Sequence, residues 1–163
     1  MGCDIHMYCE KKVEFKDKSF WICCDDFTLN PYYEMGEDSN KYDHRSIYNM
    51  RNYSLFGRLA GVRDQSVPMI DTPRGLPNDV SDFVKSESED WELDAHSHSY
   101  FTVKELLEYD KKYHDKAFHY LIKLIKKRMK REFDIWDFFN KQEKNELIKS
   151  HSEEFRIVFW FDN

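Results

Sequence analysis

The stretch CDIHMYCE at residues 3–10 alternates strictly between apolar and polar side chains. The apolar members are Cys3, Ile5, Met7 and Cys9, and the polar members are Asp4, His6, Tyr8 and Glu10. A period of two is that of a β-strand with one buried and one polar face. We therefore predict a strand over 3–15, a turn over 15–19 and a returning strand over 20–24, which together form a hairpin.

The run FRIVFWF at residues 155–161 carries large apolar side chains on both faces. Such a run is typical of a central strand, which needs partners on both sides. We therefore predict that it pairs directly with the N-terminal strand. Helical periodicity predicts helices over 46–60, 115–133 and 140–149, with a short helix around 79–86. The pair Thr102 and Glu105 has the spacing of a capping box that opens a further helix.

Residues 62–101 contain Pro68, Pro73 and Pro77 and are predicted to be a long, largely irregular loop. Segment 25–45 is also predicted to be irregular. The expected fold is a single α+β domain over residues 1–163. Its small antiparallel sheet consists of the N-terminal hairpin and the C-terminal strand. Helices cover one face of the sheet, and the long loop lies across the opposite, polar face.

The composition of the 163 residues excludes several classes of protein. Aromatic residues at 17% and hydrophobic residues at 40% exclude a disordered chain. No apolar run approaches the roughly 18 residues of a membrane helix, and the N-terminus lacks a signal-peptide core. We therefore expect a soluble cytoplasmic protein with no membrane partner and with four reduced cysteines packed as small hydrophobes.

The net charge of −6 argues against a duplex nucleic acid as partner. Segment 104–131 departs from this balance, because it holds 10 basic and 4 acidic residues. A charged helix face is most often simply solvated. The segment is nevertheless a minor indication of an anionic partner.

Two groups of residues have the chemistry of an active site. Asp4 and His6 are two apart on a predicted strand, so they project from the same face and can share a metal or act as an acid–base pair. In DAHSHSY at residues 94–100, an extended backbone would place His96 and His98 on one side. Together these side chains predict a site for zinc, manganese or iron with the ligands Asp4, His6, His96 and His98. The alternative is metal-free catalysis by Asp4, His6 and His98.

Three arginines lie beside glycine or proline, namely Arg58, Arg63 and Arg74. A guanidinium group suits phosphate, so these arginines are predicted to bind phosphate. The alternative is internal salt bridges with neighbouring aspartates. Trp91 and Tyr100 are the candidates for stacking on a ligand. The other histidines, His44 among them, are interpreted as surface or packing residues.

Four blocks of the sequence carry a family resemblance: MGCDIH at 1–6, NYSLFGRLAGVR at 52–63, RGLPNDVS at 74–81 and HSHSY at 96–100. In these blocks the chain resembles a family of small uncharacterised phage and prophage proteins that begin with MGCDIH. The resemblance covers about the first hundred residues. It implies a phage-encoded accessory protein in the host cytoplasm and carries no established activity.

These observations lead to three hypotheses of function. The first is a phosphodiester hydrolase, either metal-dependent or metal-free, that degrades a nucleotide-type signal of host immunity. The second is a non-catalytic protein that sequesters such a signal. The third is a protein-binding inhibitor of a host enzyme, with the aromatic residues as its interface. Homo-oligomerisation is compatible with all three.

Overall fold

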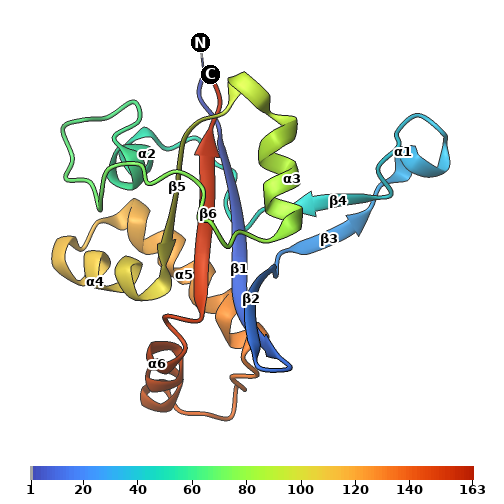
Figure 1. Ribbon diagram of the computed structural model, residues 1–163. Helices are drawn as coiled ribbons and strands as arrows, with labels where there is room; N and C mark the ends of the chain where they lie inside the picture. Colours follow the sequence, from blue (N-terminus) through green and yellow to red (C-terminus); the bar gives the residue numbers. More distant parts are fainter. Residues whose placement is uncertain (1) are drawn as a thin grey trace.

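The computed structural model describes residues 2–163 and has the predicted α+β architecture. A four-stranded antiparallel sheet has the strand order β2-β1-β6-β5, and a two-stranded sheet pairs β3 with β4 (Figure 1). The strands are β1 (Ile5–Phe15), β2 (Lys18–Cys23), β3 (Asp26–Leu29), β4 (Tyr42–Arg45), β5 (His96–Thr102) and β6 (Phe155–Phe161). The helices are α1 (Pro31–Glu34), α2 (Tyr53–Ala60), α3 (Asp82–Asp90), α4 (Val103–Tyr113), α5 (Lys116–Glu132) and α6 (Lys141–Ser150), with a 3-10 turn η1 (Glu92–Asp94). None of the helices in the described part of the chain is both long enough and apolar enough to cross a membrane.

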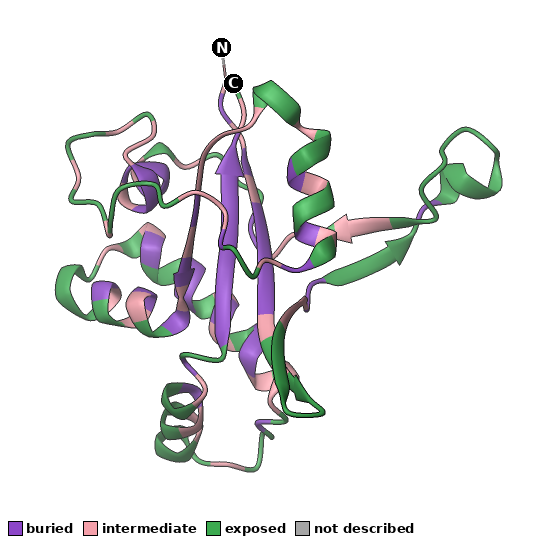
Figure 2. Cartoon of the chain, in the orientation of Figure 1, coloured by how far each residue is buried: buried purple, intermediate pink, exposed green. Residues whose placement is uncertain are grey.

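The direct pairing of the N-terminal and C-terminal strands is confirmed. β1 runs antiparallel to β6, and the register places His6 beside Trp160 and Tyr8 beside Val158. Every residue of β6 is buried, because β1 and β5 flank it and both its faces are covered (Figure 2). The chain ends lie together at one end of this strand pair (Figure 1).

The two faces of the sheet have different covers. On one face, Ile5, Met7 and Cys9 of β1 and the preceding Cys3 form the main core with side chains from α2, α4 and α5, and both cysteines are free thiols. On the other face, Tyr8, Val158 and Trp160 form a smaller core with Val84 of α3. The period-two pattern therefore predicts correctly which side chains of β1 form the main core. The opposite face, which the pattern predicts to be polar, is also largely covered.

The predicted loop over 62–101 is only partly irregular. Its second half forms α3 and then β5, the fourth strand of the main sheet. The three prolines precede α3, so they interrupt neither element. α3 does lie on the predicted face, because Glu87 on this helix accepts a hydrogen bond from Tyr8 at 3.1 Å. β5 has a bulge between His96 and Ser99, where Ser97 adopts a left-handed φ of 54°.

The predicted helix over 46–60 begins only at Tyr53. The Asn52 side chain accepts a hydrogen bond from the backbone N–H of Leu55, and this cap sets the first turn. Inside the helix, Gly57 allows close packing of the following chain. A Cβ at this position would overlap the carbonyl oxygen of Asp64 and lie 2.7 Å from Val67 Cγ2.

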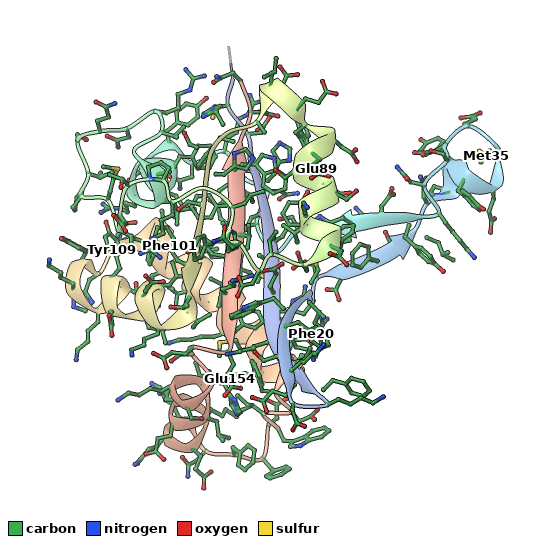
Figure 3. The ribbon with its side chains drawn as sticks, in the orientation of Figure 1. Phe20, Met35, Glu89, Phe101, Tyr109 and Glu154 are labelled. Carbon is green, nitrogen blue, oxygen red and sulfur yellow. The ribbon has the colours of Figure 1, made fainter. Side chains whose placement is uncertain are left out.

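Segment 25–45 forms an ordered arm, contrary to the prediction of an irregular segment. β3, α1 and β4 project from the body of the protein, with Met35 near the far end (Figures 1 and 3). Large apolar side chains on this arm are exposed, namely Phe27, Leu29, Tyr32, Tyr33, Met35 and Tyr42. The base of the arm places Asp25 and His44 next to β1.

Candidate functional site

A cleft of about 560 Å³ opens beside the start of β1. We call it the strand-end cleft, and its lining side chains come from β1 and the residue before it, from β4 and the segment after it, and from the residues directly after α3 and β6. They are Asp4, Ile5, His6, Met7, Tyr8, His44, Arg45, Ser46, Asn49, Trp91 and Asp162. Three of the residues predicted from the sequence, Asp4, His6 and Trp91, therefore lie together.

His6 forms a histidine–carboxylate pair with Asp162. Its Nε2 lies 3.1 Å from Asp162 Oδ2, and the other carboxylate oxygen accepts the backbone N–H of Asp4 at 2.9 Å. The ring centroid of His6 lies 4.0 Å from that of Trp91. Because a carboxylate only accepts hydrogen bonds, Nε2 is the donor in this pair, and Nδ1 is the ring nitrogen that the pair leaves free.

Asp4 is a paired carboxylate rather than a free ligand. Arg51 Nε and Nη2 contact its two oxygens at 2.6 and 2.7 Å. This bidentate hydrogen bond holds the pKa of Asp4 below its ordinary value. Asp4 is therefore ionised and oriented by Arg51 at the edge of the cleft.

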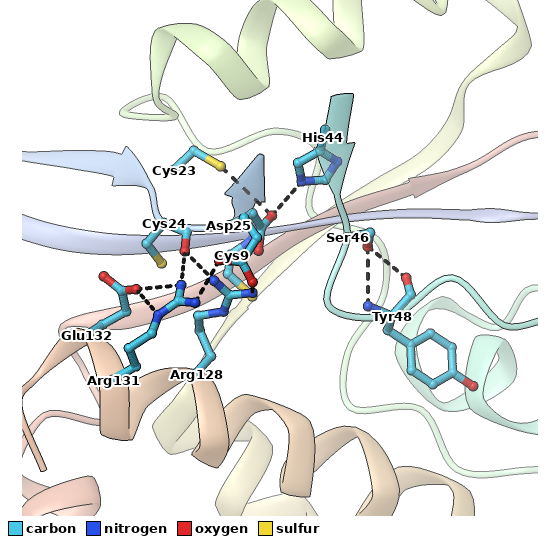
Figure 4. Close-up of polar contacts among 11 residues, drawn as sticks. Cys9, Cys23, Cys24, Asp25, His44, Ser46, Tyr48, Arg128, Arg131 and Glu132 are labelled. Carbon is cyan, nitrogen blue, oxygen red and sulfur yellow. Dashed lines mark hydrogen bonds and ion pairs between the residues drawn. The ribbon is translucent and has the colours of Figure 1, made fainter. Parts of the chain in front are cut away.

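A second histidine–carboxylate pair joins His44 to Asp25 (Figure 4). His44 Nε2 donates to Asp25 Oδ2 at 2.7 Å, and the His44 ring stacks on Tyr8 with centroids 4.5 Å apart. The Asp25 side chain is fully buried and also accepts the backbone N–H of Cys9 at 3.0 Å. His44, interpreted from the sequence as a surface or packing residue, does pack on Tyr8, and the arm also places it in the lining of the cleft.

Asp25 is also the centre of the one group with metal-ligand spacing among residues 2–163. Single ligand atoms of Cys23, Asp25 and His44 lie within 4.8 Å of one another. Within the described chain, Asp25 Oδ1 is buried without a hydrogen-bond partner, which fits a carboxylate able to take another ligand. Burial and then the charge of Asp25 raise the pKa of the Cys23 thiol to about 12, so a metal would have to displace its proton.

The four-ligand set Asp4, His6, His96 and His98 does not assemble. In the described chain, these residues form no group of three with ligand atoms within 4.8 Å. The physical reason lies in the sheet order, because β6 separates β1 from β5 and fills the space between them with Trp160. The Trp160 ring stacks with the His6 ring on one side of β6, with ring centroids 6.0 Å apart, and with the His98 ring on the other side, with centroids 5.4 Å apart.

His96 and His98 have local, structural contacts instead. His98 Nε2 lies 2.9 Å from Ser88 Oγ, and its backbone carbonyl accepts the N–H of Gly75 at 2.8 Å. His96 Nδ1 lies 3.0 Å from Ser97 Oγ. Neither ring lines the strand-end cleft. These contacts indicate that His98 holds β5 against α3.

The position of His98 predicts a pH dependence of stability. Burial, with a smaller contribution from nearby His96, lowers the pKa of His98 below the ordinary 6.5. The unfolded chain therefore binds a proton more readily than the folded chain, and the free energy of unfolding falls as the pH decreases below about 6.5. In urea titrations between pH 7.5 and 5.5, His98→Gln is expected to lose less stability than the wild type. Parallel losses in the two proteins would contradict a buried neutral His98.

The three predicted phosphate-binding arginines do not share a site. Arg58 pairs with Asp115 at 3.0 Å, and Arg74 pairs with Glu105 at 2.7 Å and with Asp71 at 3.1 Å. These two arginines therefore match the alternative of internal salt bridges. Arg63 lies at the paired chain ends, where it donates to Asn163 Oδ1 at 2.9 Å.

Tyr100, predicted to stack on a ligand, lies outside the strand-end cleft, whereas Arg45, which was not predicted, lines it. Tyr100 packs in the smaller core, with the Arg74 guanidinium 5.6 Å from its ring centroid, and does not line the strand-end cleft. The cation that does line the cleft is Arg45 at the end of β4. Sequence reasoning missed Arg45, His44 and Asp162. The only sequence signal for them was the alternating YDHR of β4 and the acidic residue directly after the C-terminal strand.

Comparison with known protein families, with curated proteins and with solved structures gave no match. The side chains of the cleft are therefore the basis for inferring a function. Two histidines that are each paired with an aspartate, one arginine and one tryptophan line a single concave surface. That combination can bind a phosphate group beside an aromatic ring and can transfer protons.

Proposed function

We propose that the strand-end cleft hydrolyses a phosphate ester bond in a nucleotide-type ligand. The observation that carries the proposal is that His6 and His44, each bonded through Nε2 to a buried or half-buried aspartate, line the same cleft. Hydrolysis of a phosphodiester needs a base for the attacking water and an acid for the leaving oxygen. A pair of histidines supplies both near neutral pH.

The proposed reaction uses the ring nitrogens that the two histidine–aspartate contacts leave free. One histidine removes a proton from water through Nδ1 while the water oxygen forms its bond to phosphorus. The other histidine, protonated beforehand, gives its proton to the leaving oxygen as the phosphorus–oxygen bond breaks. Asp162 and Asp25 hold the rings through Nε2 and stabilise the imidazolium forms. Such acid–base assistance typically contributes 10²–10⁴-fold to the rate.

Binding of the ligand is assigned to the two other side chains suited to it. Arg45 places a guanidinium at the cleft for the phosphate, and Trp91 offers an indole face for a nucleobase. The volume of about 560 Å³ lies in the range of small-molecule pockets and suits a ligand of one or two nucleotides. Taken with the resemblance to phage proteins, this supports removal of a nucleotide signal of host immunity as the role.

A metal-assisted form of the proposal is supported by the Cys23, Asp25 and His44 group. A thiolate, a carboxylate and an imidazole suit zinc better than manganese or iron. A bound metal would lower the pKa of a coordinated water and polarise the phosphate. In that case His44 holds the metal and His6 alone transfers protons.

The experiment uses a panel of cyclic and linear nucleotides, with products separated by chromatography. His6→Ala and His44→Ala are each expected to reduce turnover by at least about 100-fold in protein that remains folded. His151→Ala is the matched control, because His151 also pairs with a carboxylate, that of Glu154 at 3.0 Å, far from the cleft. Wild-type turnover in both cleft variants would refute the proposal.

Two further measurements separate the forms of the proposal. Elemental analysis of tag-free protein shows whether a metal is bound, and chelation shows whether turnover needs it. If it does, Cys23→Ser should lose that metal. If the wild type retains an intact nucleotide and Trp91→Ala does not, the cleft sequesters its ligand instead of hydrolysing it. The third hypothesis, an inhibitor of a host enzyme, is favoured by the exposed apolar side chains of the arm and predicts that the cleft variants change nothing.

A further inference from the structure

A second concavity, of about 930 Å³, lies along α5 on a different part of the surface. Its floor is the solvent face of the helix, and its wall is the chain that folds back after Glu132. The backbone N–H of Ile135 donates to the carbonyl of Lys130 at 2.7 Å, which fixes this reversal. We call it the α5 groove. It is separate from the strand-end cleft, because the two share no lining residue.

The α5 groove is strongly basic. Five cations line it, Lys123, Lys126, Lys127, Lys130 and Arg131, against the two carboxylates of Asp134 and Asp137, and of the five only Arg131 is paired within residues 2–163, with Asp26 and Glu132. Successive helix residues turn by about 100°, so these five side chains occupy one face of α5, opposite its core side chains.

The four lysines of the groove have no counter-ion in the part of the chain that the structure describes. Within residues 2–163, none of them forms an ion pair, whereas Lys11, Lys104 and Lys144 each pair with a carboxylate. Like charges three and four residues apart on a helix repel one another. A protein with a net charge of −6 thus concentrates unneutralised positive charge in one groove, where a polyanion would relieve the repulsion.

Aromatic rings accompany the lysines. Tyr120 and Trp136 line the same groove, and their exposed fractions are 45% and 58%. Exposed rings beside a row of cations are the elements with which proteins hold single strands, because bases stack on the rings while cations follow the phosphates. An acidic polypeptide would use the lysines and leave the rings unused.

We propose that the α5 groove binds single-stranded nucleic acid through its phosphate backbone, with bases stacked on Trp136. This function goes beyond hydrolysis in the strand-end cleft and does not depend on it. Four lysine–phosphate contacts predict that the logarithm of the affinity falls with the logarithm of the salt concentration with a slope of about −3. The stacking contribution is independent of salt.

The test measures the fluorescence anisotropy of a labelled oligo(dT) and a labelled oligo(U) against the full-length protein at several salt concentrations. Lys123→Glu/Lys127→Glu is expected to weaken binding at least tenfold and to flatten the salt slope. Trp136→Ala is expected to weaken binding about tenfold without changing the slope. Lys41→Glu/Lys85→Glu, which makes the same charge change at exposed positions outside the groove, should bind like the wild type.

Three outcomes would overturn the proposal. One is absence of binding to both oligomers by folded wild-type protein. Another is equal weakening in the two double-lysine variants, which would show a diffuse charge effect. The last is equal competition by polyglutamate or by duplex DNA, combined with unchanged binding by Trp136→Ala, which would assign the groove to another polyanion. Nucleotide turnover in the strand-end cleft should be unchanged in all these variants, so the two proposals fail separately.

Discussion

Replacing Arg156 with Met is expected to lower the free energy of unfolding by about 3–5 kcal/mol. Arg156 lies in the central strand β6, with 4% of its side chain exposed, and its Nε donates to Glu10 Oε2 at 2.7 Å. The Glu10 side chain is fully buried. Removal of the guanidinium leaves this carboxylate without its counter-charge in the interior, which is the costly way to break a buried pair.

The same guanidinium also binds the segment before α3 to the sheet. Its Nη1 donates to Asp79 Oδ1 at 2.7 Å, and the group lies 4.0 Å from the ring centroid of Trp21. Glu10 Oε1 accepts the backbone N–H of Ser81 at 2.8 Å, directly before α3. Loss of Arg156 therefore weakens both the β1–β6 pair and the attachment of α3.

Urea denaturation of Arg156→Met and the wild type measures this effect, and Arg51→Met supplies the control. Arg51 holds Asp4 with equally short contacts of 2.6 and 2.7 Å, but its side chain is 57% exposed. An exposed pair of this kind contributes about 0–1 kcal/mol. Similar losses in the two variants would mean that burial does not govern the strength of the Glu10–Arg156 pair.

The central part of the fold could be predicted from the sequence because its signals are local. The alternation in CDIHMYCE and the two-sided apolar character of FRIVFWF each specify a strand without reference to any other residue. The arginine inside FRIVFWF was also a signal, since a cation in a central strand demands a buried counter-charge. Glu10 is directly opposite Arg156 in the observed register.

The candidate site was only partly predictable because its partners are distant in sequence. His6 and Trp91 could be chosen by residue type, but Asp162 reaches His6 only through the β1–β6 register. His44 reaches Asp25 only because β3 and β4 form an arm, where the sequence indicated an irregular segment. The proposed approach of His98 to His6 was wrong because the sheet contains β6 between their strands.

Trp160 is the side chain that keeps those histidines apart, and Trp160→Ala is expected to lower the free energy of unfolding by about 3–5 kcal/mol. Its side chain is fully buried in the smaller core, and its ring stacks on Tyr8 with centroids 4.9 Å apart. Truncation to alanine removes this contact together with those to His6 and His98, and leaves a cavity between β1 and β5.

Trp160→Phe distinguishes the loss of packing from the loss of the indole N–H. Among the described residues, Trp160 Nε1 is buried without a hydrogen-bond partner, so phenylalanine removes an unsatisfied donor while it keeps an aromatic ring in place. We therefore expect Trp160→Phe to lose only about 1 kcal/mol in the same urea titration, because relief of the buried donor offsets part of the lost volume. A loss in Trp160→Phe as large as in Trp160→Ala would show that the N–H is satisfied in solution, for example by a buried water. A small loss in both variants would show that α3 does not seal this face of the sheet, and the cleft beside His6 would then lack a rigid wall.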